Sequence, residues 1–127
     1  MPVNDDGFIG HVGPIYAKAV EDGPELIGFL AEDIHRNLNG VVQGGMLMTL
    51  ADRGMGRIAR KANGDGPVAT VHFSYDFLGA GKLGTFIALH PVLIKETRSL
   101  IFMEGSVISE GDVIGRANGV WKKLAMK

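Results

Sequence analysis

Hydrophobic residues recur at two different spacings along this chain of 127 residues. Over residues 44–61 they return every three or four positions, which is the spacing of one face of an α-helix. From residue 66 onward the spacing falls to two, and apolar and polar side chains alternate as they do in half-buried strands. The pattern therefore predicts one long helix followed by a series of strands.

Four strands are expected after the helix, separated by glycine-rich or charged turns. They cover residues 68–78, 84–95, 100–109 and 113–123. Two shorter candidates precede the helix at residues 15–20 and 25–33, and the turn at residues 21–24 between them favours a hairpin. Pro91 implies a bulge or an unpaired amide in its strand. Residues 1–13 show no such pattern and are expected to form a loosely held arm.

One helix cannot cover a strongly twisted sheet of six strands, but a curled sheet that wraps around the helix would bury it. The expected fold is therefore α+β, a curled antiparallel sheet of about six strands around one central helix. Residues 1–127 are expected to form a single domain. Gly54 and Gly56 weaken the interior of the helix, so we expect close packing against the sheet at these positions.

Composition excludes several classes of function. The chain has no cysteine, which rules out disulfides, thiolate metal sites and a cysteine nucleophile. A formal net charge of −1 without a basic block argues against nucleic acid as a partner. No apolar stretch approaches about 18 residues and no signal peptide is evident, so we expect no membrane span and a cytoplasmic location. The histidines are widely scattered, and no metal site or cofactor is expected.

The candidate chemistry gathers where a polar, asparagine-rich loop at residues 35–43 leads into the helix. The helix begins with Gly44 and Gly45, and the first amides of a helix have no intrahelical partner and lie at the positive end of its dipole. Because neither glycine has a side chain, a ligand oxygen can approach these amides closely. Asp52 is the carboxylate that the helical segment carries.

The spacing of Gly44 and Asp52 has a consequence for assembly. Eight residues correspond to roughly 12 Å along a helix axis. A carboxylate or its water must come within about 3–3.5 Å of the carbon that it attacks. One helix can hardly deliver both groups to one substrate, whereas two antiparallel copies place the amide of one beside the carboxylate of the other. We therefore expect a homodimer with two active sites shared across its interface.

A set of residues in this region resembles a known family. They are Asn37, Gly40, Gly44-Gly45 and Leu50-Ala51-Asp52, followed by Val68-Ala69-Thr70-Val71 and the strand end Phe77-Leu78. This pattern is similar to the hot-dog-fold acyl-CoA thioesterases, in particular the phenylacetate-pathway and 4-hydroxybenzoyl-CoA branches. The resemblance covers roughly residues 14–124 and implies a hot-dog fold and a homodimer, with a dimer of dimers as the larger assembly.

The resemblance also implies hydrolysis of an acyl-CoA with a medium-chain or aryl acyl group. Asp52 would act as general base or nucleophile, the Gly44 amide of the partner subunit would polarise the carbonyl, Thr70 would hold the attacking water, and Asn37 would orient the reacting group. The expected substrate contacts are Gln43, Gly45, Met55 and Phe73. The candidates for binding the CoA phosphates are Arg36, Lys82, Arg98 and Arg116.

Two alternatives stay open. The family usually has His where this chain has Gln43, which can donate a hydrogen bond but cannot titrate near neutrality, and this favours a non-catalytic acyl-CoA-binding protein. A hot-dog dehydratase or hydratase needs a histidine and a carboxylate in one site, and no histidine follows Asp52 nearby. Trp121 is expected in the core or an interface, and Arg53, Arg57 and Lys61 on a solvated face.

Overall fold

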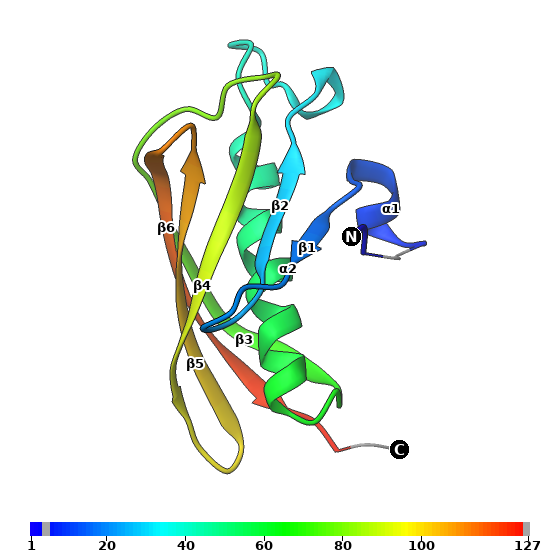
Figure 1. The fold of residues 1–127 in the computed structure, drawn as a ribbon, viewed down its shortest axis with the longest axis vertical. Helices are drawn as coiled ribbons and strands as arrows, with labels where there is room; N and C mark the ends of the chain where they lie inside the picture. The colour runs from blue at the N-terminus through cyan, green and yellow to red at the C-terminus, as the bar shows by residue number, and fades with distance from the viewer. Residues whose placement is uncertain (4–5, 126–127) are drawn as a thin grey trace.

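The computed structural model describes residues 1–3 and 6–125, and its central element is the long helix α2 (Gly44–Ala62). A six-stranded antiparallel sheet packs against this helix (Figure 1). The strands are β1 (Tyr16–Lys18), β2 (Leu26–Leu30), β3 (Val68–Phe77), β4 (Phe86–Glu96), β5 (Leu100–Ser109) and β6 (Asp112–Lys123). Their order in the sheet is β1-β2-β4-β5-β6-β3. The α+β class and the sheet packed on one central helix are thus confirmed.

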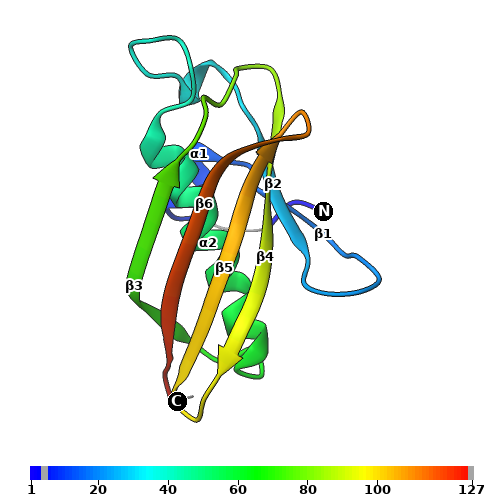
Figure 2. The same ribbon diagram turned by 90° about the vertical axis from the view of Figure 1, so that its left-hand side faces the viewer.

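Helix α2 covers one face of the sheet and is seen behind the strands in Figure 2. The opposite, outer face of the sheet is turned toward the viewer in that figure. A short helix α1 (Phe8–Val12) and a 3-10 turn η1 (Asp33–His35) complete the described elements. Within the described residues, no helix is long and apolar enough to cross a lipid bilayer.

Pro91 does not mark a bulge, because it pairs with Gly105 and the register shift in β4 falls later, between Leu93 and Lys95. Leu89 is the last residue of β4 that pairs with β2. Pro91 therefore stands where β4 has a neighbouring strand on one side only, and there a missing N–H is tolerated.

Two glycines let α2 approach the sheet closely, as the sequence predicts. A Cβ atom on Gly54 would lie 2.5 Å from Leu89 Cδ2 and 3.2 Å from Ile27 Cβ. A Cβ atom on Gly56 would lie 3.2 Å from Trp121 Nε1. Each glycine costs the helix up to about 1 kcal/mol, and burial of a large apolar side chain against it returns roughly 1.5–3 kcal/mol.

The N-terminal segment is not the loosely held arm that the sequence predicts. Its described residues pair with β1, since Val3 N donates to Ile15 O and Ala17 N donates to Met1 O, both at 2.8 Å. Ile9, on α1, is only 2% exposed and belongs to the main hydrophobic core. The burial of this side chain and the pairing along the free edge of β1 hold the segment in place.

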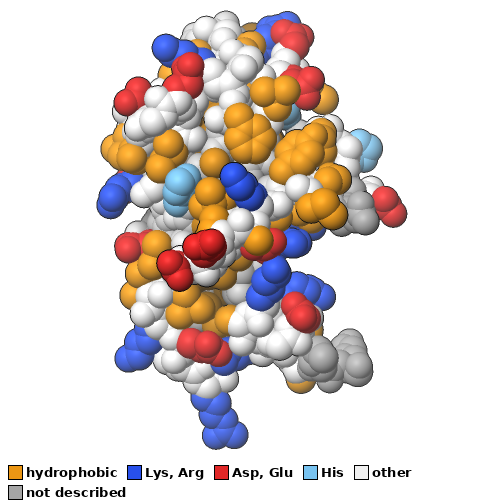
Figure 3. Space-filling view, in the orientation of Figure 1, with side chains coloured by type: hydrophobic (Ala, Val, Ile, Leu, Met, Phe, Trp, Pro, Cys, Tyr) orange, Lys and Arg blue, Asp and Glu red, His pale blue; other side chains and the backbone are white. Residues whose placement is uncertain are grey.

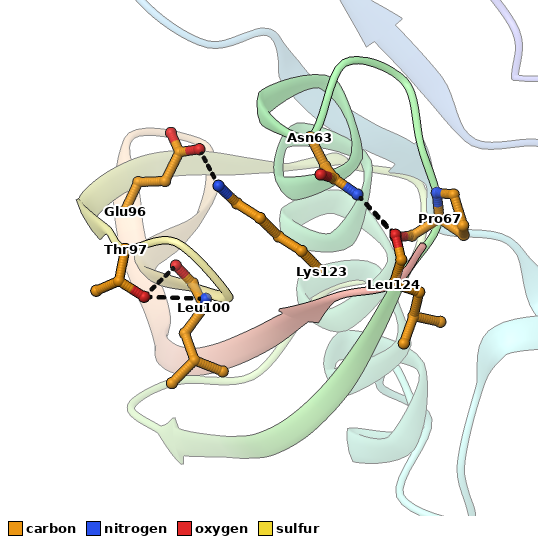
Figure 4. Close-up of polar contacts among 7 residues, drawn as sticks. All are labelled: Asn63, Pro67, Glu96, Thr97, Leu100, Lys123 and Leu124. Atoms are coloured by element: carbon orange, nitrogen blue, oxygen red, sulfur yellow. Dashed lines mark hydrogen bonds and ion pairs between the residues drawn. The ribbon is translucent and has the colours of Figure 1, made fainter. Parts of the chain in front are cut away.

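Polar contacts fix the C-terminal end of α2 relative to the sheet (Figure 4). The Asn63 amide Nδ2 donates to Pro67 O at 3.0 Å, just before β3 begins. Gly64 has φ 61, the left-handed conformation in which many helices end. Lys123 Nζ, at the end of β6, contacts Glu96 Oε2 of β4 at 2.5 Å. The Asn63 contact sets the position at which β3 starts its return along α2.

Candidate active site

Asp52 and Thr70 lie together between α2 and β3. Thr70 Oγ1 donates a hydrogen bond to Asp52 Oδ1 at 2.9 Å. The two residues are 18 positions apart in sequence, and they meet because β3 returns along the helix after the turn at residues 63–67. No other described residue forms a hydrogen bond with the Asp52 side chain. The second carboxylate oxygen is therefore available to a ligand or a water molecule.

A cavity of about 400 Å³ opens beside this pair. Apolar residues from the N-terminal segment, β2, β3 and β6 form one part of its wall, and α2 forms the other. The lining consists of Val3, Ile9, Ile15, Ile27, Asp52, Arg53, Gly56, Arg57, Arg60, Val68, Thr70 and Trp121. Figure 3 shows the hollowed face of the molecule, with Lys and Arg side chains below the N-terminal segment. The wall is thus suited to an apolar chain with a polar or negatively charged part.

The amides at the start of α2 have no partner within the described part of the chain. Gln43, the N-cap residue, makes no side-chain cap, and the first amide within α2 that has a backbone acceptor is that of Met46, which donates to Gln43 O at 2.9 Å. The amides of Gly44 and Gly45 are therefore free to donate. A Cβ atom on Gly44 would stand 2.9 Å from Cε1 of the Phe77 ring, so this end of α2 lies beside the end of β3.

Within one chain, Gly44 and Asp52 approach opposite ends of β3. Asp52 contacts Thr70 near the beginning of the strand, and Gly44 contacts Phe77 at its end. Seven residues of extended strand span roughly 23 Å. Both this span and the roughly 12 Å between Gly44 and Asp52 along α2 are too long for one substrate carbonyl to contact both groups within one chain.

A buried hydroxyl lies near the same end of β3. The Tyr75 ring packs on Phe77 with 4.6 Å between the ring centroids. Its hydroxyl is buried and has no hydrogen-bond partner in the described structure, and burial raises the pKa of Tyr75 to about 12. A Cβ atom on Gly115 would lie 1.8 Å from this hydroxyl, so Gly115 provides the space that Tyr75 occupies.

The loop before α2 is held by Asn37 and His35. Asn37 Oδ1 accepts hydrogen bonds from Asn39 N at 2.8 Å and Val41 N at 3.3 Å. This oxygen shapes the loop, so only the amide nitrogen of Asn37 is left to contact a substrate. His35 is buried, accepts a hydrogen bond from Glu32 N through Nδ1 at 2.9 Å and contacts Val12 O through Nε2. His35 thereby ties the loop to the N-terminal segment.

The remaining predicted contacts do not line the cavity of a single chain. Gln43 and Gly45 are exposed at the start of α2, Met55 is fully buried in the core, and Phe73 is half-buried on β3. Their contact with substrate stays a prediction for the assembled dimer. The four candidates for binding CoA phosphates also lie outside the cavity lining, and Arg36 pairs with Asp33 at 2.8 Å.

Several residues that line the cavity are predicted from the sequence to lie in other places. Trp121 is a core residue as expected, but it also lines the cavity, and Arg53 and Arg57 line it rather than lying on a purely solvated face. A signal for part of this set was present in the sequence. Gly56 and Arg60 follow Asp52 by four and eight positions, and residues at this spacing share one face of a helix.

Glu25 balances part of the positive charge at the cavity rim. Its Oε1 lies 2.6 Å from Lys61 Nζ and 3.1 Å from Arg57 Nε. The hydrogen bond from Lys61 is the main cause of a lowered pKa for Glu25; the hydrogen bond from Arg57 adds to it, and partial burial opposes it. The contact joins the beginning of β2 to the last turns of α2.

Replacing Glu25 with Gln is expected to lower the free energy of unfolding by about 1 kcal/mol at neutral pH. Because the pKa of Glu25 is lowered in the folded chain, its stabilisation is present above the unfolded pKa and is lost as the pH falls through the folded pKa. Thermal unfolding should show a midpoint lower by a few degrees near neutrality and no difference at a pH of about 2. An equal difference at both pH values would contradict this assignment.

Comparison with known proteins places this geometry in a family. Residues 39–115 match the family model described as the thioesterase superfamily. A Pseudomonas aeruginosa protein, provisionally named an esterase, is 26% identical over 111 residues, which cover 87% of this chain and 83% of that protein. The residues of this chain that match the family model contain α2 and most of the sheet.

Two solved structures are similar throughout their fold. A mutant of the phenylacetic acid degradation protein PaaI from Thermus thermophilus has a TM-score of 0.80 and 23% identity, with 94% of this chain and 100% of that chain covered. A Bacillus halodurans protein crystallised with CoA has a TM-score of 0.85 and 21% identity, with 94% and 80% covered. Because the family model matches more than half of this chain, the chain belongs to the thioesterase superfamily, and its fold is the hot-dog fold.

Proposed function

We propose that this protein hydrolyses acyl-CoA thioesters with a medium-chain or aryl acyl group. The observation that carries the proposal is the hydrogen bond from Thr70 to Asp52 at the wall of a cavity of about 400 Å³. A carboxylate held in this way, with one oxygen left open, is suited to remove a proton from a bound water. Membership in the thioesterase superfamily and the CoA bound to the Bacillus halodurans relative support a CoA ester as the substrate.

The active site is completed by a second copy of the chain. β3 is an edge strand of ten residues, and its outer edge has no neighbour within the described chain. A free edge of this length is a ready surface for pairing. If two copies of β3 pair antiparallel about a point between Phe73 and Ser74, one residue past the middle of the strand, Thr70 of one copy lies opposite Phe77 of the other. The Gly44 amide of one subunit then approaches Asp52 of the partner subunit.

A β-bulge makes this arrangement possible. Thr70 and Phe77 are an odd number of residues apart, so in a regular strand their side chains would point to opposite faces. The register shift between Thr70 and His72 corrects the alternation, because Thr70 pairs with Trp121 and Phe77 pairs with Gly115, two buried positions on β6. Both ends of β3 therefore present their side chains to α2.

The reaction follows from these positions. Asp52, held by Thr70, takes a proton from water as the water oxygen attacks the thioester carbon, or its carboxylate attacks that carbon directly. The Gly44 amide stabilises the negative charge that develops on the carbonyl oxygen, an effect worth about 3–4 kcal/mol for one donor. In the first route the tetrahedral intermediate collapses, the C–S bond breaks, and CoA leaves as a thiolate that takes up the proton from Asp52. In the second route the collapse leaves an anhydride between the acyl group and Asp52, which water then hydrolyses to the free acid and the Asp52 carboxylate, and the proton from that water goes to the CoA thiolate.

A non-catalytic acyl-CoA-binding protein is the second candidate. Gln43 stands beside the Gly44 amide, is exposed and does not titrate near neutrality. In such a protein the same cavity would hold the acyl group without turnover.

A hydrolysis assay over straight-chain and aryl acyl-CoAs distinguishes the candidates. Appearance of one free thiol and one free acid per thioester, with kcat/KM of at least about 10⁴ M⁻¹s⁻¹ for one substrate, is the expected result. Binding of the same esters without thiol release would favour the non-catalytic protein. Hydration of crotonyl-CoA without thiol release would favour a dehydratase or hydratase.

A further inference from the structure

Trp121 carries a buried hydrogen-bond donor that the fold leaves unused. It is the single tryptophan of the chain and is 1% exposed. None of the described residues accepts a hydrogen bond from its indole N–H. The nitrogen is not fully enclosed by the protein, so it keeps some accessible surface. Indole N–H groups inside proteins usually have an acceptor, so this nitrogen is available to an acceptor from outside the protein, either water or a ligand.

The N–H group opens into the cavity beside Asp52. Trp121 pairs with Thr70 across β6 and β3 and lines the cavity with it. A Cβ atom on Gly56 would lie only 3.2 Å from Trp121 Nε1. Gly56 therefore leaves the donor uncovered. Because Gly56 follows Asp52 by four residues, the donor lies roughly one helical turn, about 5.4 Å, along α2 from the candidate base.

We propose that the indole N–H of Trp121 selects acyl groups that carry an acceptor oxygen near their fourth carbon. This inference rests on the proposed function, since it places the thioester carbon at Asp52. Three carbon–carbon bonds and one carbon–oxygen bond of an extended chain span about 5 Å, the length of one helical turn. A ketone or carboxylate oxygen at the fourth carbon then reaches Trp121, whereas a methyl group there leaves the donor unpaired.

The charges around the cavity agree with an oxygen-bearing acyl group. Arg57 and Arg60 line the same cavity, and Asp52 is the carboxylate among the described lining residues. The positive charge of Arg57 is partly neutralised by its ion pair with Glu25. A purely aliphatic chain gains nothing from these groups, whereas an oxygen with partial or full negative charge is attracted to them.

Two acyl-CoAs of nearly equal shape test the proposal. 4-Oxopentanoyl-CoA and 4-methylpentanoyl-CoA differ by one oxygen in place of one methyl group. The native protein is expected to give a kcat/KM at least about 10-fold higher for the oxo compound, since the methyl compound offers the Trp121 N–H no acceptor. Equal values for the two esters would overturn the proposal.

Two variants connect the preference to Trp121. Trp121→Phe removes the N–H and keeps an aromatic ring in the core, and Gly56→Ala keeps Trp121 but places a methyl group over Nε1. Each is expected to bring the ratio of the two kcat/KM values close to one, through a loss on the oxo ester. If Trp121→Phe does not fold, Gly56→Ala decides. A ratio that stays at its native value in the folded variants would refute the role of Trp121.

A binding measurement separates this inference from the proposed function. The single tryptophan reports ligand binding through its own fluorescence, so both esters can be titrated into the Asp52→Asn protein without turnover. Tighter binding of the oxo ester supports the role of Trp121, and equal affinities oppose it. If the native protein hydrolyses no acyl-CoA at all, the proposed function fails, but the same titration of the native protein still tests the preference of the cavity.

Discussion

Replacing Asp52 with Asn is expected to lower kcat for acyl-CoA hydrolysis by about 10³-fold and to leave the fold intact. Asparagine has the size of aspartate, and its carbonyl oxygen can accept the hydrogen bond that Thr70 Oγ1 donates at 2.9 Å. It cannot take a proton from water. The loss should therefore appear in kcat, while KM changes little, because the cavity wall and the Gly44 amide are unaltered.

Thiol release under saturating substrate measures kcat, and thermal unfolding verifies the fold. Asp76→Asn is a suitable control, because Asp76 is an exposed carboxylate on β3, opposite Arg116 in the register with β6, and does not line the cavity beside Asp52. It should retain native activity. If Asp52→Asn kept kcat within a few-fold of the native value, another group would have to be the base, and the mechanism proposed above would be wrong.

The helix and the later strands could be predicted because their signals are local and long. The predicted bounds of α2 differ from the observed ones by a single residue, and β5 (Leu100–Ser109) is predicted without error. The short strands β1 and β2 are less well predicted. Leu30 ends β2 three residues early because the chain then enters η1, and the length of so short a strand depends on its neighbours rather than on its own pattern.

The N-terminal segment shows what a local pattern cannot reveal. Ile9 is one of several apolar residues scattered among glycines and polar residues, and no periodicity marks it as part of the core. Its burial depends on a pocket formed by residues far away in sequence. Tertiary contacts of this kind decide whether such a segment is ordered, and they are invisible to periodicity.

The site was predictable only in part for the same reason. The resemblance named Asp52 and Thr70, and the structure brings these two side chains together. It gave no indication of Trp121, because the contact of Trp121 with the cavity depends on the register of β6 against β3 and on the bulge after Thr70. Register and bulges are set by the packed sheet as a whole.

A mixture of two inactive variants is expected to recover activity if the active site is shared between subunits. Asp52→Asn removes the base, and Gly44→Pro removes the amide donor while retaining the helix, since proline is tolerated at the first helical position. Gly44→Pro alone should lower kcat by about 10²–10³-fold, the usual loss for one oxyanion donor. The Phe77 ring, which stands 2.9 Å from the position of the new Cβ, is 55% exposed and has room to move.

The recovered fraction can be calculated from the symmetry. In a dimer of one Asp52→Asn chain and one Gly44→Pro chain, one site has both its amide and its carboxylate intact, and the other has neither. Random pairing makes about half of the dimers mixed, each with one working site of two, so about a quarter of the native activity should return. The measurement is thiol release after the two proteins are refolded together from denaturant.

The controls make the outcome decisive. Asp52→Asn refolded with Asp52→Ala should stay inactive, because both chains lack the base and no pairing restores it. If Asp52→Asn and Gly44→Pro together give only the sum of their residual activities, while size-exclusion chromatography shows dimers, each site lies within one chain. Gly44 of that chain would then be too far from Asp52 to act on the same carbonyl, and a different donor would have to stabilise the oxyanion. Recovery of about a quarter instead requires that the amide of one helix and the carboxylate of the other act on one substrate, which is the arrangement that the two ends of β3 favour.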